Sequence, residues 1–163
     1  MNRILFVFLI LFTATSCAKE IDGWDKTTWG MTIEQAKNLY SDSSEYVTSE
    51  GGNNVVGLRV KNQALYNLPV ISFLKFENNK LTSVRLVHLY NGKEFLHPTH
   101  AERTPEYKEF QSSLESDYGS PDFINELEDF GWYELGWYAG STMVKLTHKP
   151  DSVFIDYFER LKK

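Results

Sequence analysis

The histidines of this sequence are the residues whose type first suggests chemistry, because imidazole is a common zinc ligand. His97 and His100 lie three residues apart in the segment HPTH. The other histidines and the nearest carboxylates are His88, His148, Glu94 and Glu102. A zinc site needs three or four converging ligands, and Pro98 disfavours the helical turn that would align His97 with His100. We therefore expect His97 and His100 to lie in a loop, and we expect no bound metal or other cofactor.

The residues that carry nucleophilic or acid–base catalysis form no recognisable pattern either. No serine lies in a Gly-x-Ser-x-Gly segment, and the glycines do not follow the spacing of a phosphate-binding loop. One acidic stretch contains Asp117, Glu126, Glu128, Asp129 and Glu134. Glycosidases use two carboxylates at a defined separation, and the spacing here selects no pair. We therefore expect a solvated acidic face and a protein that is not an enzyme.

Cys17, the only cysteine, follows a segment with the features of a secretory signal peptide. Arg3 supplies a positive charge, residues 4–12 are apolar, and small residues precede Cys17. The apolar run is about half of the ~20 residues that a membrane-spanning helix needs. Residues 1–16 are therefore predicted to be a signal peptide that is removed.

The segment Ala14-Thr15-Ser16-Cys17 resembles a bacterial lipobox, in which the cysteine becomes acylated. The resemblance implies a palmitate-class lipid on Cys17, a lipidated tether over residues 17–23 and an anchor in a bacterial membrane. Ala18 stands where aspartate would imply retention at the inner membrane, so the implied location is the outer membrane, facing the periplasm. The alternative is an ordinary secreted protein in which Cys17 is a free thiol or pairs with another chain.

The composition is that of a globular protein and argues against two classes of chain. Of 163 residues, 42% are hydrophobic and 15% are aromatic, which is too aromatic for a disordered chain. The net charge is −5 and no basic block is present, so nucleic acid is not an expected partner. We expect one domain over residues 24–163, or two similar halves over residues 24–92 and 100–163, without an internal disulfide.

Two helices are predicted from the signals at their ends. Thr32 followed by Gln35 forms a capping box, which predicts a helix over residues 32–41. A second helix is predicted over residues 104–118, where a threonine and a proline open the segment. Gly119 stands directly after it, at the position where glycine commonly ends a helix.

Strands are predicted between and after the helices. A strand over residues 55–60 is followed by a hairpin whose turn is Asn78-Asn79, since asparagine tolerates positive φ. The expected cross-strand pairs are Glu77 with Lys80, Phe73 with Val84, and Ile71 with Leu86. Further strands are predicted over residues 130–138, 141–148 and 152–161. The order helix–strand–strand–strand occurs twice, so we expect an α+β fold in two layers, with two helices packed on an antiparallel sheet.

These elements resemble a known group of bacterial envelope proteins. The motifs are the lipobox, the helix entry Gly30-Met31-Thr32, the hairpin segment FENNKLTSV and the helix exit Gly119-Ser120-Pro121. They are similar to those of the BamE (SmpA/OmlA) and β-lactamase-inhibitor-protein-like group, whose units are helices packed on a small antiparallel sheet. The resemblance implies that fold for this chain, and it implies a functional residue only at Cys17.

The segment FGWYELGWYAG, residues 130–140, is rich in aromatic side chains. Alternation along a strand places Trp132 on one face and Tyr133 and Trp137 on the other. Trp and Tyr contribute much of the energy of protein interfaces. The candidate partner-binding residues are therefore Trp132, Tyr133, Trp137 and Tyr138. The alternative is a strand that is buried on one face and half-covered on the other.

The sequence favours a lipid-anchored, non-catalytic envelope protein that binds another envelope protein, with a role in assembly or maintenance of the cell surface. The alternative is a small secreted or periplasmic ligand-binding protein or hydrolase, with a site near His88 and His148. A hydrolase would need a histidine and a carboxylate within hydrogen-bond reach of each other in a concave site.

The lipobox predicts that Cys17→Ala abolishes both signal processing and membrane attachment, because acylation needs the thiol. The mature wild-type chain should begin at residue 17 and carry the added mass of its acyl groups. Intact mass spectrometry of protein extracted from membranes measures both properties. A mature chain that begins elsewhere, or a Cys17→Ala variant that is processed and attached like the wild type, would contradict the assignment.

Overall fold

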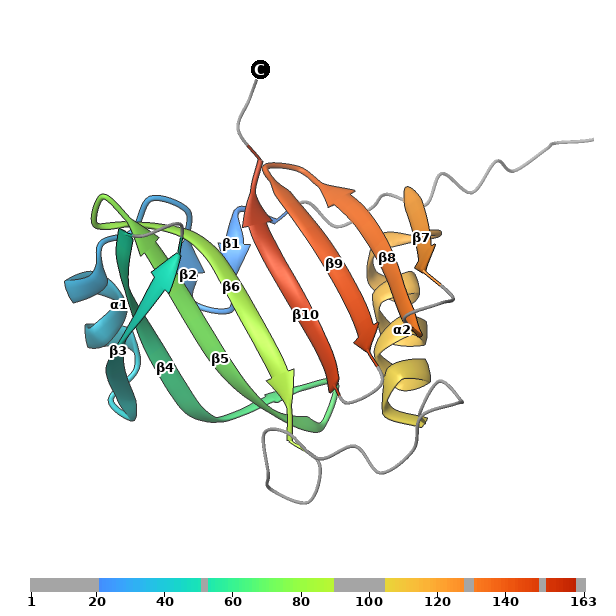
Figure 1. Ribbon diagram of the computed structural model, residues 1–163, viewed down its shortest axis with the longest axis horizontal. Helices are drawn as coiled ribbons and strands as arrows, with labels where there is room; N and C mark the ends of the chain where they lie inside the picture. The colour runs from blue at the N-terminus through green and yellow to red at the C-terminus, as the bar shows by residue number, and fades with distance from the viewer. Residues whose placement is uncertain (1–20, 51–52, 90–104, 128–130, 150–151, 161–163) are drawn as a thin grey trace, which may run out of the picture.

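One antiparallel sheet of eight strands organises the computed structural model, with two helices and a small two-stranded sheet beside it (Figure 1). The structure describes residues 21–50, 53–89, 105–127, 131–149 and 152–160. The elements are β1 (Gly23–Trp24), β2 (Thr27–Thr28), α1 (Ile33–Leu39), β3 (Ser43–Glu50), β4 (Asn53–Leu65), β5 (Leu68–Glu77), β6 (Lys80–His88), α2 (Pro105–Tyr118), β7 (Phe123–Leu127), β8 (Trp132–Ala139), β9 (Thr142–Lys149) and β10 (Ser152–Glu159). The strand order in the large sheet is β3-β4-β5-β6-β10-β9-β8-β7, so the fold is α+β and mostly strand.

Each half of the chain forms a helix followed by a four-stranded meander, and the two meanders meet at their last strands. β6 pairs with β10 in antiparallel register, with Arg85 opposite Asp156 and Leu86 opposite Ile155. The two halves therefore share one continuous sheet.

The prediction of three strands in each half is wrong, because the sequence patterns of the two outermost strands, β3 and β7, are weak. β3 reads SSEYVTSE within a segment of turn-forming residues, and β7 has only five residues. Each pairs with a single neighbour in the sheet, so neither needs a continuous apolar pattern. Polar and charged side chains on such outer strands also discourage pairing with other chains.

The capping box of α1 and the glycine that ends α2 are confirmed. Thr32 Oγ1 accepts a hydrogen bond from the Gln35 amide (3.3 Å), and Gln35 Oε1 accepts one from the Thr32 amide (2.8 Å). α1 is shorter than predicted, because Tyr40 already has extended backbone angles. After α2, Gly119 has a φ of 83°, the left-handed conformation that ends many helices. Residue 104, the predicted first residue of the second helix, lies outside the described residues.

The β5–β6 hairpin has the predicted turn, but its register differs from the prediction. Asn78 and Asn79 have φ angles of 50° and 61°. A bulge next to the turn places one extra residue on β6, which moves every later pair by one. The observed pairs are Glu77 with Lys80, Phe73 with Arg85, and Ile71 with Val87. The shift brings the charged Arg85, and not Val84, beside Phe73.

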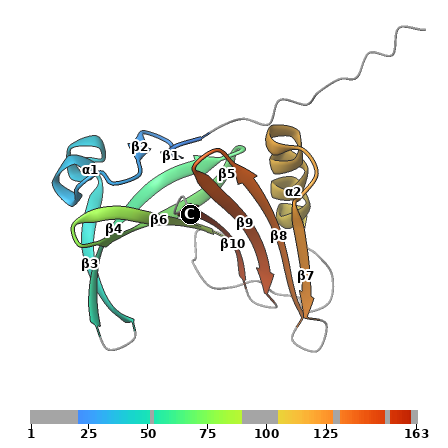
Figure 2. The ribbon, with the colours of Figure 1, turned by 90° about the horizontal axis from the view of Figure 1, so that it is seen from above.

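Both helices and the small sheet lie on one face of the large sheet, which we call the helix-covered face (Figure 2). Its apolar side chains form the core together with Tyr107, Phe110 and Leu114 of α2. The buried Trp137 donates its indole Nε1–H to the carbonyl of Gly119 (2.8 Å), which joins β8 to the end of α2. No described element covers the opposite face, which we call the open face.

The large sheet is curved, and its outer strands β3 and β7 bend toward the open face (Figure 2). At both edges, an aromatic ring on the outer strand covers a glycine on the next strand. Tyr46 lies opposite Gly57, and Phe123 lies opposite Gly136. A Cβ atom on Gly57 would lie 2.3 Å from the Tyr46 ring, and one on Gly136 would lie 2.0 Å from the Phe123 ring. Rings in this position shield the glycine backbone, and the glycines allow a sheet edge to bend.

The described chain begins at one end of the sheet. Of the predicted tether over residues 17–23, the structure describes residues 21–23. Ile21 forms a parallel bridge with Gly140, and Gly23 belongs to β1. Cys17 and the predicted signal peptide lie outside the described residues. Within the described ranges, neither helix has the length and apolarity to cross a membrane.

The contact between Phe123 and Gly136 predicts a measurable coupling. Gly136→Ala should lower the free energy of unfolding by about 1 kcal/mol, because the added methyl group displaces the Phe123 ring. In a Phe123→Ala background the same substitution should be neutral or stabilising, because alanine loses less backbone entropy than glycine on folding. A double-mutant cycle measured by urea unfolding tests this. Equal effects of Gly136→Ala in both backgrounds would show that the ring is not what excludes a side chain there.

Candidate functional site

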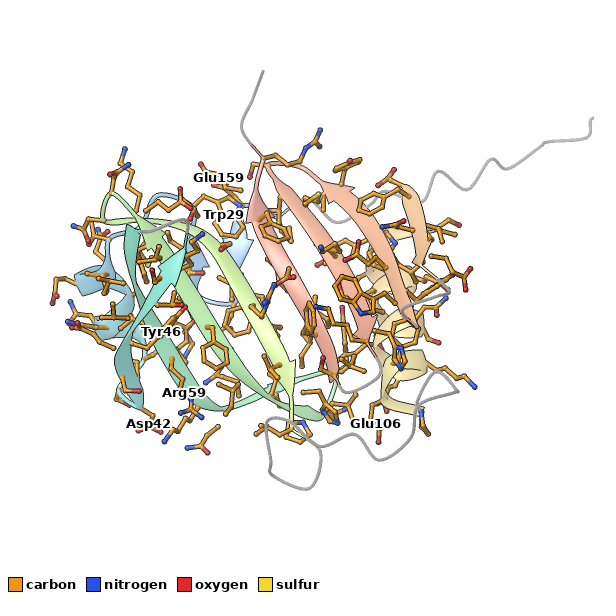
Figure 3. The ribbon with its side chains drawn as sticks, viewed as in Figure 1. Trp29, Asp42, Tyr46, Arg59, Glu106 and Glu159 are labelled. Atoms are coloured by element: carbon orange, nitrogen blue, oxygen red, sulfur yellow. The ribbon has the colours of Figure 1, made fainter. Side chains whose placement is uncertain are left out.

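A groove of about 720 Å³ lies on the open face of the sheet, which is the face toward the viewer in Figure 3. Both halves of the chain contribute to it, because β6 and β10 are neighbours there. Its lining residues are Tyr46, Val47, Thr48, Phe73, Lys75, Ser83, Arg85, Val87, Ser152, Phe154, Asp156 and Phe158. Aromatic rings and charged groups are thus combined in an open groove on a curved surface. Small molecules are bound in pockets that bury most of their surface, whereas an open surface of this kind suits a large partner.

Rings and cations alternate across six neighbouring strands of the open face. The order is Arg59 (β4), Phe73 (β5), Arg85 (β6), Phe154 (β10), Lys149 (β9) and Trp132 (β8), a set that we call the cation–aromatic row. The distances from cation to ring centroid are 5.8 Å for Arg59 and Phe73, 4.6 Å for Arg85 and Phe154, 5.4 Å for Lys149 and Phe154, and 4.0 Å for Lys149 and Trp132. Phe73 and Arg85 complete the row as direct cross-strand partners.

The cation–aromatic contacts of the row shield the rings from water and restrict the positions of the cations. A cation over an aromatic face contributes about 0.5–1 kcal/mol at exposed sites and about 2 kcal/mol when water is excluded. Two further pairs, Lys145 over Phe158 (6.0 Å) and Arg160 over Tyr138 (4.6 Å), extend the same arrangement. The charged groups therefore cover ring faces that water would otherwise contact, and the rings in turn restrict where each charge lies.

An ion pair across the junction of the two halves fixes the middle of the row. Arg85 Nε donates to Asp156 Oδ1 (2.7 Å), and Arg85 Nη2 donates to Asp156 Oδ2 (3.1 Å). The Asp156 side chain is 3% exposed, whereas that of Arg85 is 52% exposed. A bidentate pair sets the plane of the guanidinium group. Arg85 therefore holds a defined orientation over Phe154 while part of it remains accessible.

A second carboxylate of the open face, Glu134, is held by three donors. Lys145 Nζ (3.0 Å), Asn125 Nδ2 (3.3 Å) and Thr147 Oγ1 (3.5 Å) donate hydrogen bonds to it. Burial alone would raise the pKa of Glu134, but these hydrogen bonds and the charge of Lys145 lower the pKa overall. Glu134 is thus stabilised as the carboxylate, and it neutralises part of the positive charge on this face.

The alternation predicted along β8 divides the four candidate contact residues between the two faces of the sheet. Trp132 and Tyr138 lie on the open face and are 36% and 47% exposed. Tyr133 is partly buried against Tyr107 of α2, with ring centroids 6.1 Å apart. Trp137 is 1% exposed. Because α2 covers that side of β8, Trp137 is a core residue, and only Trp132 and Tyr138 present a substantial surface to a partner.

The histidines do not form a site in the described part of the chain. Outside that part lie Glu94, His97, His100 and Glu102. His88 contacts the Phe110 ring edge-on, and His148 contacts the Tyr107 ring in the same way, with centroids 5.8 and 5.3 Å apart. Both imidazoles therefore lie on the helix-covered face, against α2. Among the described residues no three potential metal ligands come together.

Two of the acidic residues named from the sequence, Asp117 and Glu134, lie on opposite sides of the sheet. Asp117 lies on the helix-covered side and accepts a hydrogen bond from the Tyr66 hydroxyl (2.7 Å), whereas Glu134 lies on the open face. Glu126 is exposed on β7. Glu128 and Asp129 lie outside the described residues. Since the sheet separates Asp117 from Glu134, these two carboxylates cannot act together on one substrate.

A second pocket, of about 550 Å³, lies on the helix-covered side beside the small sheet. Its carboxylates each accept a hydrogen bond from a hydroxyl: Asp22 from Ser141, Asp25 from Tyr40 and Asp117 from Tyr66. Burial, together with the charge of Asp117, raises the pKa of Tyr118 to about 12, and burial and the bond to Asp117 raise the pKa of Tyr66 further. These tyrosines therefore stay protonated and serve as structural donors.

Sequence reasoning finds Trp132 but misses the other members of the row, because they are scattered over strands whose order in the sheet is not their order in the chain. One usable signal is the alternation in SVFIDYFE. It places Phe154, Asp156 and Phe158 on one face, opposite to Val153, Ile155 and Tyr157, which belong to the core beneath the helices.

Comparisons of the chain with protein-family models, with curated proteins and with solved structures find no match. The chemistry of its own open face is therefore the basis for a functional assignment.

Lys145→Met should lower the free energy of unfolding by about 1 kcal/mol at pH 7, because it removes the charge beside the partly buried Glu134. The folded pKa of Glu134 lies below its ordinary value of 4.5, so the contribution of the pair is present at neutral pH and is lost as the pH falls through the folded value. Urea unfolding should therefore show a smaller effect of the substitution at pH 3 than at pH 7.

The matched control is Lys108→Met on the exposed surface of α2. This variant loses the same charge at a position without a described ion pair, so its effect on stability should be small at both pH values. An effect of Lys145→Met that is undiminished at pH 3 would contradict the electrostatic role of the pair.

Proposed function

We propose that this protein is a lipid-anchored bacterial envelope protein without catalytic activity, and that it binds another envelope protein on the open face of its sheet. The observation that carries the proposal is the cation–aromatic row on a curved surface that no described element covers. Trp, Tyr and Arg are the residue types that contribute most to interface energies. A row of fixed rings and cations also loses little side-chain freedom when a partner binds.

The charge of the open face indicates which chemical groups the surface of the partner should carry. The cations that the strand registers place on this face include Arg59, Lys75, Lys80, Arg85, Lys145 and Lys149, and the carboxylates include Glu77, Glu134 and Asp156. The chain as a whole has a net charge of −5, so positive charge is concentrated on this face. A partner surface that combines carboxylates with apolar side chains would complement both the cations and the rings.

The proposed location rests on the lipobox. The signal peptide over residues 1–16 would be removed, and Cys17 would carry the lipid in the outer membrane with the domain facing the periplasm. The resemblance to the BamE and β-lactamase-inhibitor-protein-like group supports the same assignment on short motifs alone. The rival site near His88 and His148 lacks comparable support, because both imidazoles pack against rings of α2.

Lys149→Glu should weaken capture of the partner about tenfold or more, because it reverses a charge that contacts two rings of the row. The matched control is Lys108→Glu, the same substitution with the same change in net charge on the exposed surface of α2. Crosslinking in native membranes, affinity purification and quantitative mass spectrometry compare the two variants with the wild type.

A second pair of variants leaves the net charge unchanged. Trp132→Ala removes an exposed ring of the row. Leu39→Ala truncates a side chain on α1 that is 37% exposed, close to the 36% of Trp132. The proposal predicts a protein that is lost from Trp132→Ala and Lys149→Glu but kept by both controls, with all four variants folded by circular dichroism. If no captured protein follows this pattern, the open face is not the binding surface.

A further inference from the structure

The first described residue is fastened to one end of the sheet. Ile21 forms a parallel bridge with Gly140, and its carbonyl accepts hydrogen bonds from the hydroxyls of Ser141 (3.3 Å) and Thr142 (2.9 Å). The Asp22 carboxylate accepts another from Ser141 (2.5 Å). The turn between β8 and β9 therefore sets where residue 21 lies.

That turn belongs to an end of the sheet that we call the tethered rim. Glu159, the last residue of β10, lies opposite Thr142, and Arg160 donates its amide to the Ser141 carbonyl (2.7 Å). Figure 3 shows Glu159 at this end and Glu106, in the first turn of α2, at the opposite end. The tethered rim comprises the Gly140–Ser141 turn, the end of β10 and the β5–β6 turn (Figure 1).

The chain between Cys17 and Ile21 is too short for the domain to place the opposite end of the sheet against the membrane while Cys17 is anchored there. Three residues separate them, so the four steps span at most ~14 Å in any conformation. The eight residues of β10 alone extend over about 26 Å. If the opposite end of the sheet faced the lipid, Ile21 would lie about one strand length away, which exceeds that reach.

The charge of the helix-covered side argues against an orientation in which α2 lies flat on the bilayer. α2 carries the carboxylates Glu106, Glu109, Glu115 and Asp117 and the single cation Lys108. Anionic headgroups repel such a surface. The open face is also disfavoured as the lipid contact, because β1 lies on the helix-covered side of the sheet (Figure 2).

We infer that the tethered rim faces the membrane and that the strands of the large sheet run away from it, so that the open face looks sideways along the bilayer. The inference rests on the proposed acylation of Cys17 and adds an orientation to it. A partner that binds the cation–aromatic row then approaches parallel to the membrane. The partner class that fits is a protein anchored in, or bound to, the same membrane.

Two matched cysteine variants test this orientation, since the acyl group would block the only native thiol. Glu159→Cys places a thiol on the tethered rim, and Glu109→Cys places one on the second turn of α2. Each full-length, acylated variant is labelled with a fluorophore and reconstituted in phosphatidylethanolamine/phosphatidylglycerol vesicles. Lipids with a nitroxide on the headgroup should quench the Glu159→Cys probe at least about twofold more than the Glu109→Cys probe.

A linker variant tests the cause of the orientation. Insertion of twenty Gly/Ser residues after Glu20 adds a flexible segment with a root-mean-square span of about 25 Å, close to a strand length, so the difference between the probes should largely disappear. A difference of full size in this variant would overturn the short tether as the cause.

Intact mass spectrometry of the same samples separates the two proposals. An unacylated Cys17 would overturn the proposed anchor and the orientation with it. An acylated protein in which the Glu109→Cys probe is quenched as strongly as the Glu159→Cys probe, or more strongly, would overturn the orientation alone.

Discussion

The pairing of β6 with β10 is the constraint on which the rest of the structure depends. Five residue pairs along these strands join two four-stranded meanders that are far apart in the chain. The first meander has little helix layer of its own, since α1 has only seven residues and short helices are marginal without packing. On the open face the same junction places Arg85 beside Asp156 and Phe154. Without it, neither the continuous groove nor the middle of the cation–aromatic row would exist.

The two halves also solve the problem of a free sheet edge in the same way. Tyr46 covers Gly57 at one edge, and Phe123 covers Gly136 at the other. Each ring protects a backbone that lacks a side chain, while the glycine allows the outer strand to approach and bend. Because both outer strands bend to the side away from the helices, the uncovered face becomes concave. A concave face can surround a partner from three sides, which a flat sheet cannot do.

Features that depend on neighbouring residues could be predicted from the sequence. Features that depend on which distant strands pair could not. The cap formed by Thr32 and Gln35, and the turn at Asn78-Asn79, depend on neighbouring residues and are found as predicted. The outer strands β3 and β7 are missed, because a strand with one neighbour needs little apolar pattern. Along β8 the alternation is correct, but both of its faces carry aromatic side chains. Only the position of α2 shows that Trp137 is buried, and only the β6–β10 junction shows that Phe154 lies beside Arg85.

The arrangement of the row resolves a conflict between solubility and recognition. An uncovered sheet face with several large rings would be a liability in water, because exposed apolar patches promote association. Here the cations cover the rings, and Asp156 and Glu134 hold two of those cations in turn. In the proposed orientation Phe154 lies five residues of β10 from the tethered rim, or about 16 Å. That distance is about twice the Debye length of ~8 Å at physiological ionic strength. Anionic headgroups would therefore not neutralise the row, and its positive charge would remain available to a protein partner that extends beyond the membrane surface.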